Sequence, residues 1–211
     1  MRLVDHPEFF SGLRAVDAEH PLRVLVSGCI AGLPCGVDGT DYGMGGCLAD
    51  LLALDRIEVF SFCPEDAGIG TPRTMPDLHD GDGRALLEGR ARVLDEHGRD
   101  WSTQMRRGAE AMLAFARQVD PELCILTDMS AACGTQVISL GCRFDEPRRF
   151  QRGMGVAATM LSDAGYCVVS QRDARSLARL RRHLGEGSGP TDETLDHHET
   201  EWVKRYFGDE G

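Results

Sequence analysis

The stretch Val24-Leu25-Val26-Ser27-Gly28-Cys29 decides the fold, because it is typical of a short buried strand that ends in a glycine and a cysteine. The apolar runs at residues 57–62 and 123–127 have the same form and lead into loops that carry Cys63 and Cys133. In an open parallel sheet, the loops at the carboxyl ends of the strands converge on one crevice where ligands bind. We therefore expect the three thiols to face one crevice, as a metal or cluster site with one open coordination position.

The segments around these runs alternate between predicted helices and strands. Helices are expected at residues 45–55, 103–118, 153–165 and 173–184, with Ser102 and Asp173 as N-caps, a further strand at 166–170, and a hairpin formed by 85–87 and 91–94. This alternation predicts an α/β fold, a single Rossmann-like domain whose parallel sheet is flanked by helices. We expect that domain to span residues 22–184. An N-terminal extension at 1–21 would hold a short helix over 7–16, and a C-terminal extension at 185–211 would be helical around Trp202, Tyr206 and Phe207.

The composition is that of an ordinary globular domain with a small-molecule partner. The chain has 211 residues, 42% of them hydrophobic and 27% charged, and no apolar stretch approaches the length of a membrane span. The N-terminal residues include several carboxylates and no continuous apolar region, so we expect no secretory signal and a cytoplasmic protein. A formal net charge of −11 disfavours a polynucleotide partner and favours a small substrate. The oligomeric state is left open.

The cysteine content points to metal binding, catalysis or burial rather than to disulfides. The chain has eight cysteines, and no two of them are separated by only two residues, which disfavours a local ferredoxin-like or zinc-ribbon module. Cys124 and Cys167 lie within apolar strands and are expected to be buried, whereas Cys35, Cys47 and Cys142 have no assigned role. From the pattern alone, plain burial is an equal alternative for the three strand-end cysteines.

Charged and hydroxyl side chains lie close in sequence to the strand-end cysteines. Glu65 follows the second of these cysteines and is a candidate general acid or base, the alternative being a hydrogen-bond acceptor in the loop. Ser130 precedes the third cysteine and offers a hydroxyl, or it simply caps the loop. Arg73 is a candidate for orienting the substrate, with a structural ion pair as the favoured alternative. Asp38 is first a turn residue and only second a substrate contact.

Five motifs follow one another along the chain in an informative order. They are Val26-Ser27-Gly28-Cys29, Val37-Asp38-Gly39, Phe62-Cys63-Pro64-Glu65, Gly70-Thr71-Pro72-Arg73 and Ser130-Ala131-Ala132-Cys133-Gly134. Each motif alone is weak, but the combination resembles the TudS-like 2-thiouracil desulfidase family, formerly a domain-of-unknown-function family. The resemblance covers residues 22–172.

The resemblance implies a cofactor and a reaction. It implies a [4Fe-4S] cluster held by only three cysteines, Cys29, Cys63 and Cys133, so that one iron is open to the substrate sulfur. It also implies catalytic roles for Glu65 and Ser130. The implied reaction is a non-redox desulfuration of a thiolated nucleobase or nucleoside that releases sulfide. The expected partner is therefore a small thiolated heterocycle.

The chain departs from the family pattern within these motifs. Gly28 stands where the family usually has Ala or a close analogue, Val37 stands where it has Tyr, and Ala131-Ala132 replace Pro-Ser. These differences leave the identity of the substrate open. For the same cysteines, the alternatives are a cluster carrier, a redox sensor, or a zinc-dependent hydrolase or sulfurtransferase.

Overall fold

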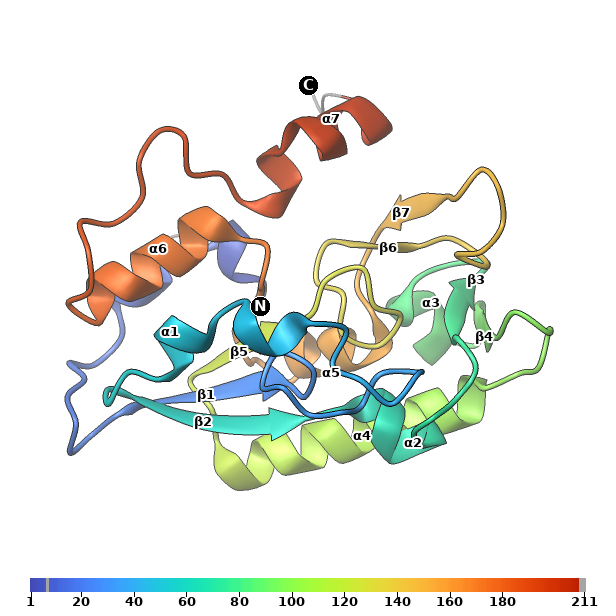
Figure 1. Ribbon diagram of the computed structural model, residues 1–211, viewed down its shortest axis with the longest axis horizontal. Coiled ribbons are helices and arrows are strands. Elements are labelled where there is room, and N and C mark those ends of the chain that lie inside the picture. Colours follow the sequence, from blue (N-terminus) through green and yellow to red (C-terminus); the bar gives the residue numbers. More distant parts are fainter. Residues whose placement is uncertain (7, 209–211) are drawn as a thin grey trace.

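A four-stranded parallel sheet forms the centre of the computed structural model, which describes residues 1–6 and 8–208 (Figure 1). Its strands are β1 (Leu22–Ser27), β2 (Ile57–Phe62), β5 (Leu123–Leu126) and β8 (Val168–Ser170), in the order β2-β1-β5-β8. Every neighbouring pair is parallel, so the carboxyl ends of all these strands meet at one edge of the sheet. Parallel strands need crossover connections, and here these are helices on both faces. The predicted α/β fold is confirmed.

Alternating side chains along the strands create two hydrophobic cores, one on each face of the sheet. Leu25 and Cys124 belong to the first core, whereas their sequence neighbours Val24 and Ile125 belong to the second. The first core is covered by α2 (Pro64–Ile69), α3 (Gly83–Leu87), α4 (Ser102–Val119) and α5 (Val156–Asp163), and the second by α1 (Ala49–Leu52) and α6 (Ala174–His183). Cys124 and Cys167 are 0% and 3% exposed, which confirms their predicted burial.

Two glycines let α2 lie unusually close to α4. A Cβ atom on Gly108 would stand 1.9 Å from the carbonyl oxygen of Pro64, and one on Gly68 would stand 2.1 Å from the carbonyl oxygen of Gln104. Any side chain at either position would push the two helices apart. Because α2 begins directly after Cys63 at the end of β2, α4 fixes the position of the first turn of α2.

Two small antiparallel sheets complete the fold. β3 (Asp77–His79) pairs with β4 (Arg92–Leu94), and β6 (Val137–Ser139) pairs with β7 (Phe150–Arg152). The predicted hairpin of 85–87 with 91–94 is wrong, because the first segment belongs to α3 and the second pairs with β3. The Asp82 carboxylate starts α3 by accepting a hydrogen bond from the Ala85 amide at 3.0 Å. Burial of Ala85 and Leu86 in the first core holds the helix in place.

Several other predicted elements are shorter than expected. Residues 45–55 hold only α1 and part of a 3-10 turn (Met44–Gly46). Helix α5 begins three residues after its predicted start, because β7 comes first. Strand β8 begins at Val168, two residues after its predicted start at 166. The helix predicted over 7–16 is wrong: the structure has 3-10 turns at Leu3–Asp5 and Phe9–Ser11, and residue 7 lies outside the described part of the chain. The predicted C-terminal helix is present as α7 (Glu201–Phe207). No described helix is long and apolar enough to cross a membrane.

The two predicted helix caps use their side chains differently. Ser102 is the first residue of α4 rather than its cap, and its hydroxyl accepts a hydrogen bond from the Val93 amide at 2.9 Å. Asp173 does occupy the N-cap position of α6, which matches the predicted helix. Its carboxylate, however, accepts from the amides of Ser170 and His197 at 2.9 and 3.0 Å instead of from the first turn.

Candidate active site

A cavity of about 370 Å³ opens at the carboxyl ends of the parallel strands. Each strand of the sheet contributes to its wall: Cys29 follows β1, Glu65 follows β2, Ser130 follows β5 and Arg172 follows β8. We call this space the strand-end cavity. It lies where open α/β sheets bind their ligands, so the strand order itself dictates its position.

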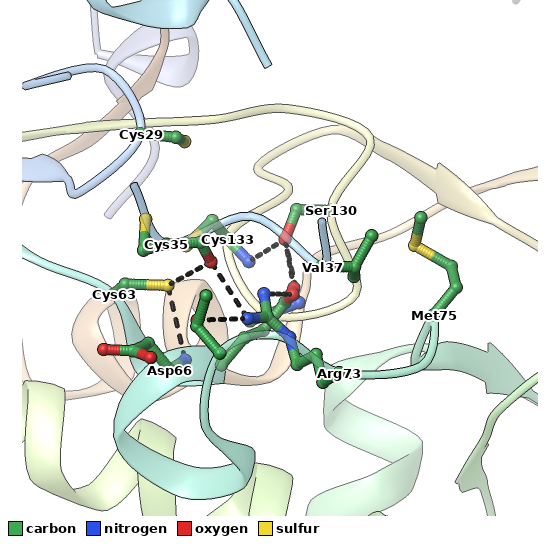
Figure 2. A network of polar contacts seen from close by, with 12 residues as sticks. Cys29, Cys35, Val37, Cys63, Asp66, Arg73, Met75, Ser130 and Cys133 are labelled. Carbon is green, nitrogen blue, oxygen red and sulfur yellow. Dashed lines mark hydrogen bonds and ion pairs between the residues drawn. The ribbon is translucent and has the colours of Figure 1, made fainter. Parts of the chain in front are cut away.

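Thiols from separate segments gather at the strand-end cavity (Figure 2). Cys29, Cys63 and Cys133 all line it, as the strand-end positions predict, and Cys35 joins them. Gly28 keeps this group compact, because a Cβ atom there would lie 3.2 Å from both the Cys35 Sγ and the Cys63 Cβ. The sequence gives no signal for Cys35, since its place depends on how the loop after β1 folds back.

The Cys35 thiol makes its two neighbours more acidic. Its hydrogen bond lowers the pKa of Cys29 to about 7 and also lowers the pKa of Cys63. Thr127 Oγ1 lies 2.9 Å from the Cys29 Sγ, and the Asp66 amide donates to the Cys63 Sγ at 3.4 Å. Because the thiolate is the form that binds metals, Cys29 and Cys63 are prepared as ligands.

Cys133 differs from these two thiols. It is only 5% exposed, and burial raises its pKa well above the ordinary value. A neighbouring metal cation would deprotonate such a thiol on coordination. In the described part of the chain, no three His, Cys, Asp or Glu side chains stand close enough to bind a single metal ion.

Glu65 is held from two sides at the wall of the strand-end cavity. The Ser130 hydroxyl donates to its Oε1 at 3.0 Å, and the Arg73 Nη2 donates to its Oε2 at 2.6 Å, contacts that Figure 2 marks with dashed lines. The side chains of Glu65 and Arg73 are 15% and 3% exposed, so the ion pair is largely shielded from water. Two donors give the carboxylate one defined orientation, which a general base requires.

Arg73 ties this carboxylate to the surrounding backbone. Its Nη1 donates to the carbonyl oxygens of Cys35 and Gly70 at 2.9 and 3.1 Å and to Thr71 Oγ1 at 3.0 Å. Burial disfavours the charge of the guanidinium, but the neighbouring Glu65 carboxylate outweighs burial, and the pKa of Arg73 is raised. The structural ion pair that the sequence favoured is thus observed. The buried Nε of Arg73 has no hydrogen-bond partner among the described residues.

Ser130 performs both of the tasks that the sequence offered as alternatives. Its Oγ accepts hydrogen bonds from the amides of Ala132 and Cys133 at 3.2 and 3.0 Å, which caps the loop. The same hydroxyl donates its hydrogen to Glu65. Ser130 therefore links the loop that carries one thiol to the carboxylate that follows another.

Asp38 lies outside the strand-end cavity. Its exposed carboxylate accepts hydrogen bonds from the amide and hydroxyl of Thr40 at 2.9 and 2.8 Å, which makes a turn. The neighbouring Val37 amide donates to the hydroxyl of Tyr42 at 2.6 Å, and Tyr42 does line the cavity. The turn at Asp38 therefore affects the cavity through Tyr42 and not through its own carboxylate.

Several cavity residues carry no recognisable sequence motif. Met75 and Arg143 flank strands of the small antiparallel sheets, and Arg143 is bound to the buried Asp77 at 2.6 Å. Met129 lies between β5 and the Ser130 hydroxyl and has a φ of 62°, which is uncommon for a long side chain and is typical of functional sites. These residues reach the cavity only through tertiary packing, so the sequence could not single them out.

Comparisons with known proteins identify the family of the chain. Residues 24–173 match the family model described as 2-thiouracil desulfurase. The chain is 29% identical over 155 residues to the uncharacterized protein YbbK of Bacillus subtilis (strain 168). That alignment covers 73% of this chain and 99% of YbbK. It is similar to the solved structure of the [4Fe-4S]-dependent thiouracil desulfidase TudS, with 28% identity, a TM-score of 0.61, and coverage of 76% of this chain and 98% of that one. The chain belongs to the 2-thiouracil desulfurase family.

Proposed function

We propose that this protein is a [4Fe-4S]-dependent desulfidase that hydrolyses the carbon–sulfur bond of a small thiolated nucleobase or nucleoside. The observation that carries the proposal is that Cys29, Cys63 and Cys133 share one cavity with the hydrogen-bonded pair Glu65 and Ser130. The family supports the class of substrate, and the similarity to TudS supports the cofactor. Water supplies the oxygen of the product and sulfide leaves, so no electron is gained or lost overall.

The donor set of the strand-end cavity fits an iron–sulfur cluster. Thiolates are the usual ligands of such clusters, and the pKa values of Cys29 and Cys63 are lowered by Cys35. We assign the ligands to Cys29, Cys63 and Cys133, which leaves one iron without a protein ligand. When bound, the cluster would supply a Lewis-acidic iron that takes the substrate sulfur as a ligand and makes it a better leaving group.

The other candidate functions are less well supported. A zinc site would use the same three thiolates, and the similarity to the [4Fe-4S]-dependent TudS favours the cluster over zinc. A cluster carrier or redox sensor has no use for a carboxylate that is fixed toward the cavity by Ser130 and Arg73. The Glu65 network therefore favours an enzyme.

We assign Glu65 the role of general base. Its two oxygens each keep an unused lone pair after binding Ser130 and Arg73, so the carboxylate can accept a proton from water. That water attacks the carbon that bears the sulfur. The fixed carboxylate needs no reorientation before the proton moves, which favours the transition state.

Ser130 and Arg73 complete the proposed site. The Ser130 hydroxyl is both a donor and an acceptor, so it can pass the proton from Glu65 toward the departing sulfur. Arg73 is proposed to orient the substrate indirectly, by holding the Glu65 carboxylate in place. For Asp38, whose carboxylate is bound to Thr40, we propose a role in the turn and not in substrate binding.

Anaerobic reconstitution with iron and sulfide, followed by an absorbance assay on 2-thiouracil and 4-thiouridine, tests the proposal. We expect a brown protein that contains iron and acid-labile sulfide and converts at least one of these compounds. Glu65→Gln should keep the iron and lose turnover, whereas Asp66→Asn, a neighbouring exposed carboxylate, should keep both. Near-normal turnover by Glu65→Gln would refute the base assignment, and an active colourless protein that contains zinc would refute the cluster.

A further inference from the structure

We propose that His197, in the C-terminal extension, is a positioning residue that holds the loop carrying Ser130 and Cys133 in its active shape. We call residues 127–137 the β5 loop. The inference rests on the proposed function for the roles of Ser130 and Cys133, but the contact between the extension and the β5 loop is independent of those roles.

His197 and Asp128 form a buried pair. The His197 Nδ1 lies 2.5 Å from the Asp128 Oδ2, and the two side chains are 4% and 0% exposed. An ionised carboxylate can only accept hydrogen bonds, so Nδ1 carries the hydrogen and donates it. Asp128 is a wall residue of the strand-end cavity, so this bond joins the extension directly to the proposed site.

The other oxygen of Asp128 closes the base of the β5 loop. Its Oδ1 accepts hydrogen bonds from the amides of Thr135, Gln136 and Val137 at 2.9, 3.3 and 3.4 Å. Ser130 and Cys133 lie on the segment between Asp128 and these amides. This carboxylate therefore helps to set where the hydroxyl and the thiol stand. His197 binds the other oxygen of the same carboxylate.

His197 is itself held so that it cannot easily turn away. Its backbone amide donates to the Asp173 Oδ1 at 3.0 Å, and Gln136 of the β5 loop donates to the same oxygen at 2.5 Å. The Trp202 ring of α7 stacks on the imidazole with a centroid distance of 5.9 Å and an angle of 9°. The preceding residue, Asp196, accepts from the amide and hydroxyl of Ser176 at 2.8 and 2.9 Å. The extension is thus bound to α6 and to the β5 loop, and its own helix α7 packs on His197.

This support lies outside the part of the chain that the family shares. The family model ends at residue 173, and TudS is matched over 98% of its own length while covering 76% of this chain. His197 therefore belongs to a segment that this chain adds to the shared fold. That segment completes the hydrogen bonding of a carboxylate at the proposed active site.

Amide hydrogen exchange of the cluster-free protein tests the positioning role apart from any activity. His197→Leu removes the donor, and His197→Gln carries its amide past the Nδ1 position. In both variants we expect the amides of Thr135, Gln136 and Val137 to exchange at least tenfold faster, with helix α4 unchanged. His197→Asn, whose amide nitrogen takes the place of Nδ1, should restore slow exchange. Tyr206→Phe removes a different contact of the extension, the hydrogen bond from the Phe150 amide at 2.8 Å, and should leave these amides unaffected.

The reconstituted variants give the second readout. His197→Leu should bind at least twofold less iron per chain and should lose kcat with KM nearly unchanged, and His197→Asn should recover both. Wild-type exchange in His197→Leu and His197→Gln, or an equal effect of Leu and Asn, would overturn the positioning role. If exchange changes as expected while even the wild-type protein shows no turnover, the proposed function fails and the positioning of the β5 loop stands.

Discussion

Ser130 donates its hydroxyl hydrogen to Glu65 at 3.0 Å across 65 positions of sequence, and this bond joins the β5 loop to the first turn of α2. The same two segments carry Cys133 and Cys63. The proposed cluster ligands Cys63 and Cys133 and the proposed base Glu65 are therefore positioned by the same two segments of backbone. A change that displaces either segment should disturb metal binding and proton transfer together.

Replacing Ser130 tests this coupling. Ser130→Ala removes the bond to Glu65 and leaves the amides of Ala132 and Cys133 without their acceptor. We expect turnover to fall by ~10²–10⁴-fold, the usual range for a group that moves protons, together with weaker retention of iron. Steady-state assays and iron analysis measure the two effects, with Ser61→Ala on β2 as the control. Unchanged turnover would show that the hydroxyl takes no part in proton transfer.

The buried ion pair should be visible in the stability of the cluster-free protein. Arg73→Ala leaves the Glu65 carboxylate buried without its cation, and we expect the free energy of unfolding to fall by ~3–5 kcal/mol. The double variant Arg73→Ala/Glu65→Gln should recover part of that loss, because a neutral amide does not need a counter-charge. Urea unfolding measures both. Equal losses in the single and the double variant would mean that the pair does not stabilise the fold.

The acidity of Cys29 should depend on Cys35. In the cluster-free protein, Cys35→Ala removes the hydrogen bond that lowers the pKa of Cys29 to about 7, so this pKa should rise toward that of an ordinary thiol. The thiolate fraction at neutral pH then falls, and alkylation of Cys29 should slow by about tenfold, because each pKa unit changes the thiolate fraction about tenfold. The pH profile of alkylation, read by mass spectrometry, measures this change. Cys142→Ala should leave the profile unmoved, and a profile equally unmoved by Cys35→Ala would contradict the contact.

The close approach of α2 and α4 should tolerate no methyl group. Gly108→Ala places a Cβ 1.9 Å from the Pro64 carbonyl oxygen, and such overpacking should lower the free energy of unfolding by ~1–3 kcal/mol. Displacement of α2 should also reduce turnover, since Glu65 stands in its first turn. Gly46→Ala, where a Cβ meets nothing within 4 Å, is the matched control and should be neutral. If both variants unfold alike, the backbone contact does not restrain α2.

Local sequence patterns predicted the central sheet and the helices α4, α5 and α6, but not α3 or most of the small antiparallel strands. β1 and β5 are buried apolar runs bounded by turn formers, as predicted, whereas β2 at the edge of the sheet buries only Ile57 fully and leaves Val59 37% exposed. α3 was mistaken for a strand because Ala85-Leu86-Leu87 is short and apolar, and the Asp82 cap gave the only helical signal. β4 was predicted as a strand but with the wrong partner, whereas β6 and β7 were missed because three-residue strands have too little alternation to recognise.

The proposed site was accessible from sequence only where its residues follow strands. Cys29, Cys63 and Cys133 reach one cavity because parallel strands deliver them there. Cys35 reaches the same region through a loop that folds back, and His197 reaches it through the docked C-terminal extension. The position of these two residues along the sequence does not predict either contact. The Arg73–Glu65 pair was one of two alternatives, and only burial and distance decided that it forms.

In the proposed reaction, Glu65 activates the water that replaces sulfur, without electron transfer. The most direct measurement is the incorporation of oxygen from isotopically labelled water into the product, when the anaerobically reconstituted protein converts 2-thiouracil with no reductant present. We predict uracil that carries the heavy oxygen, formed together with an equal amount of sulfide, and loss of this product in Glu65→Gln despite retained iron. Product without the label, or turnover that requires a reductant, would contradict the account.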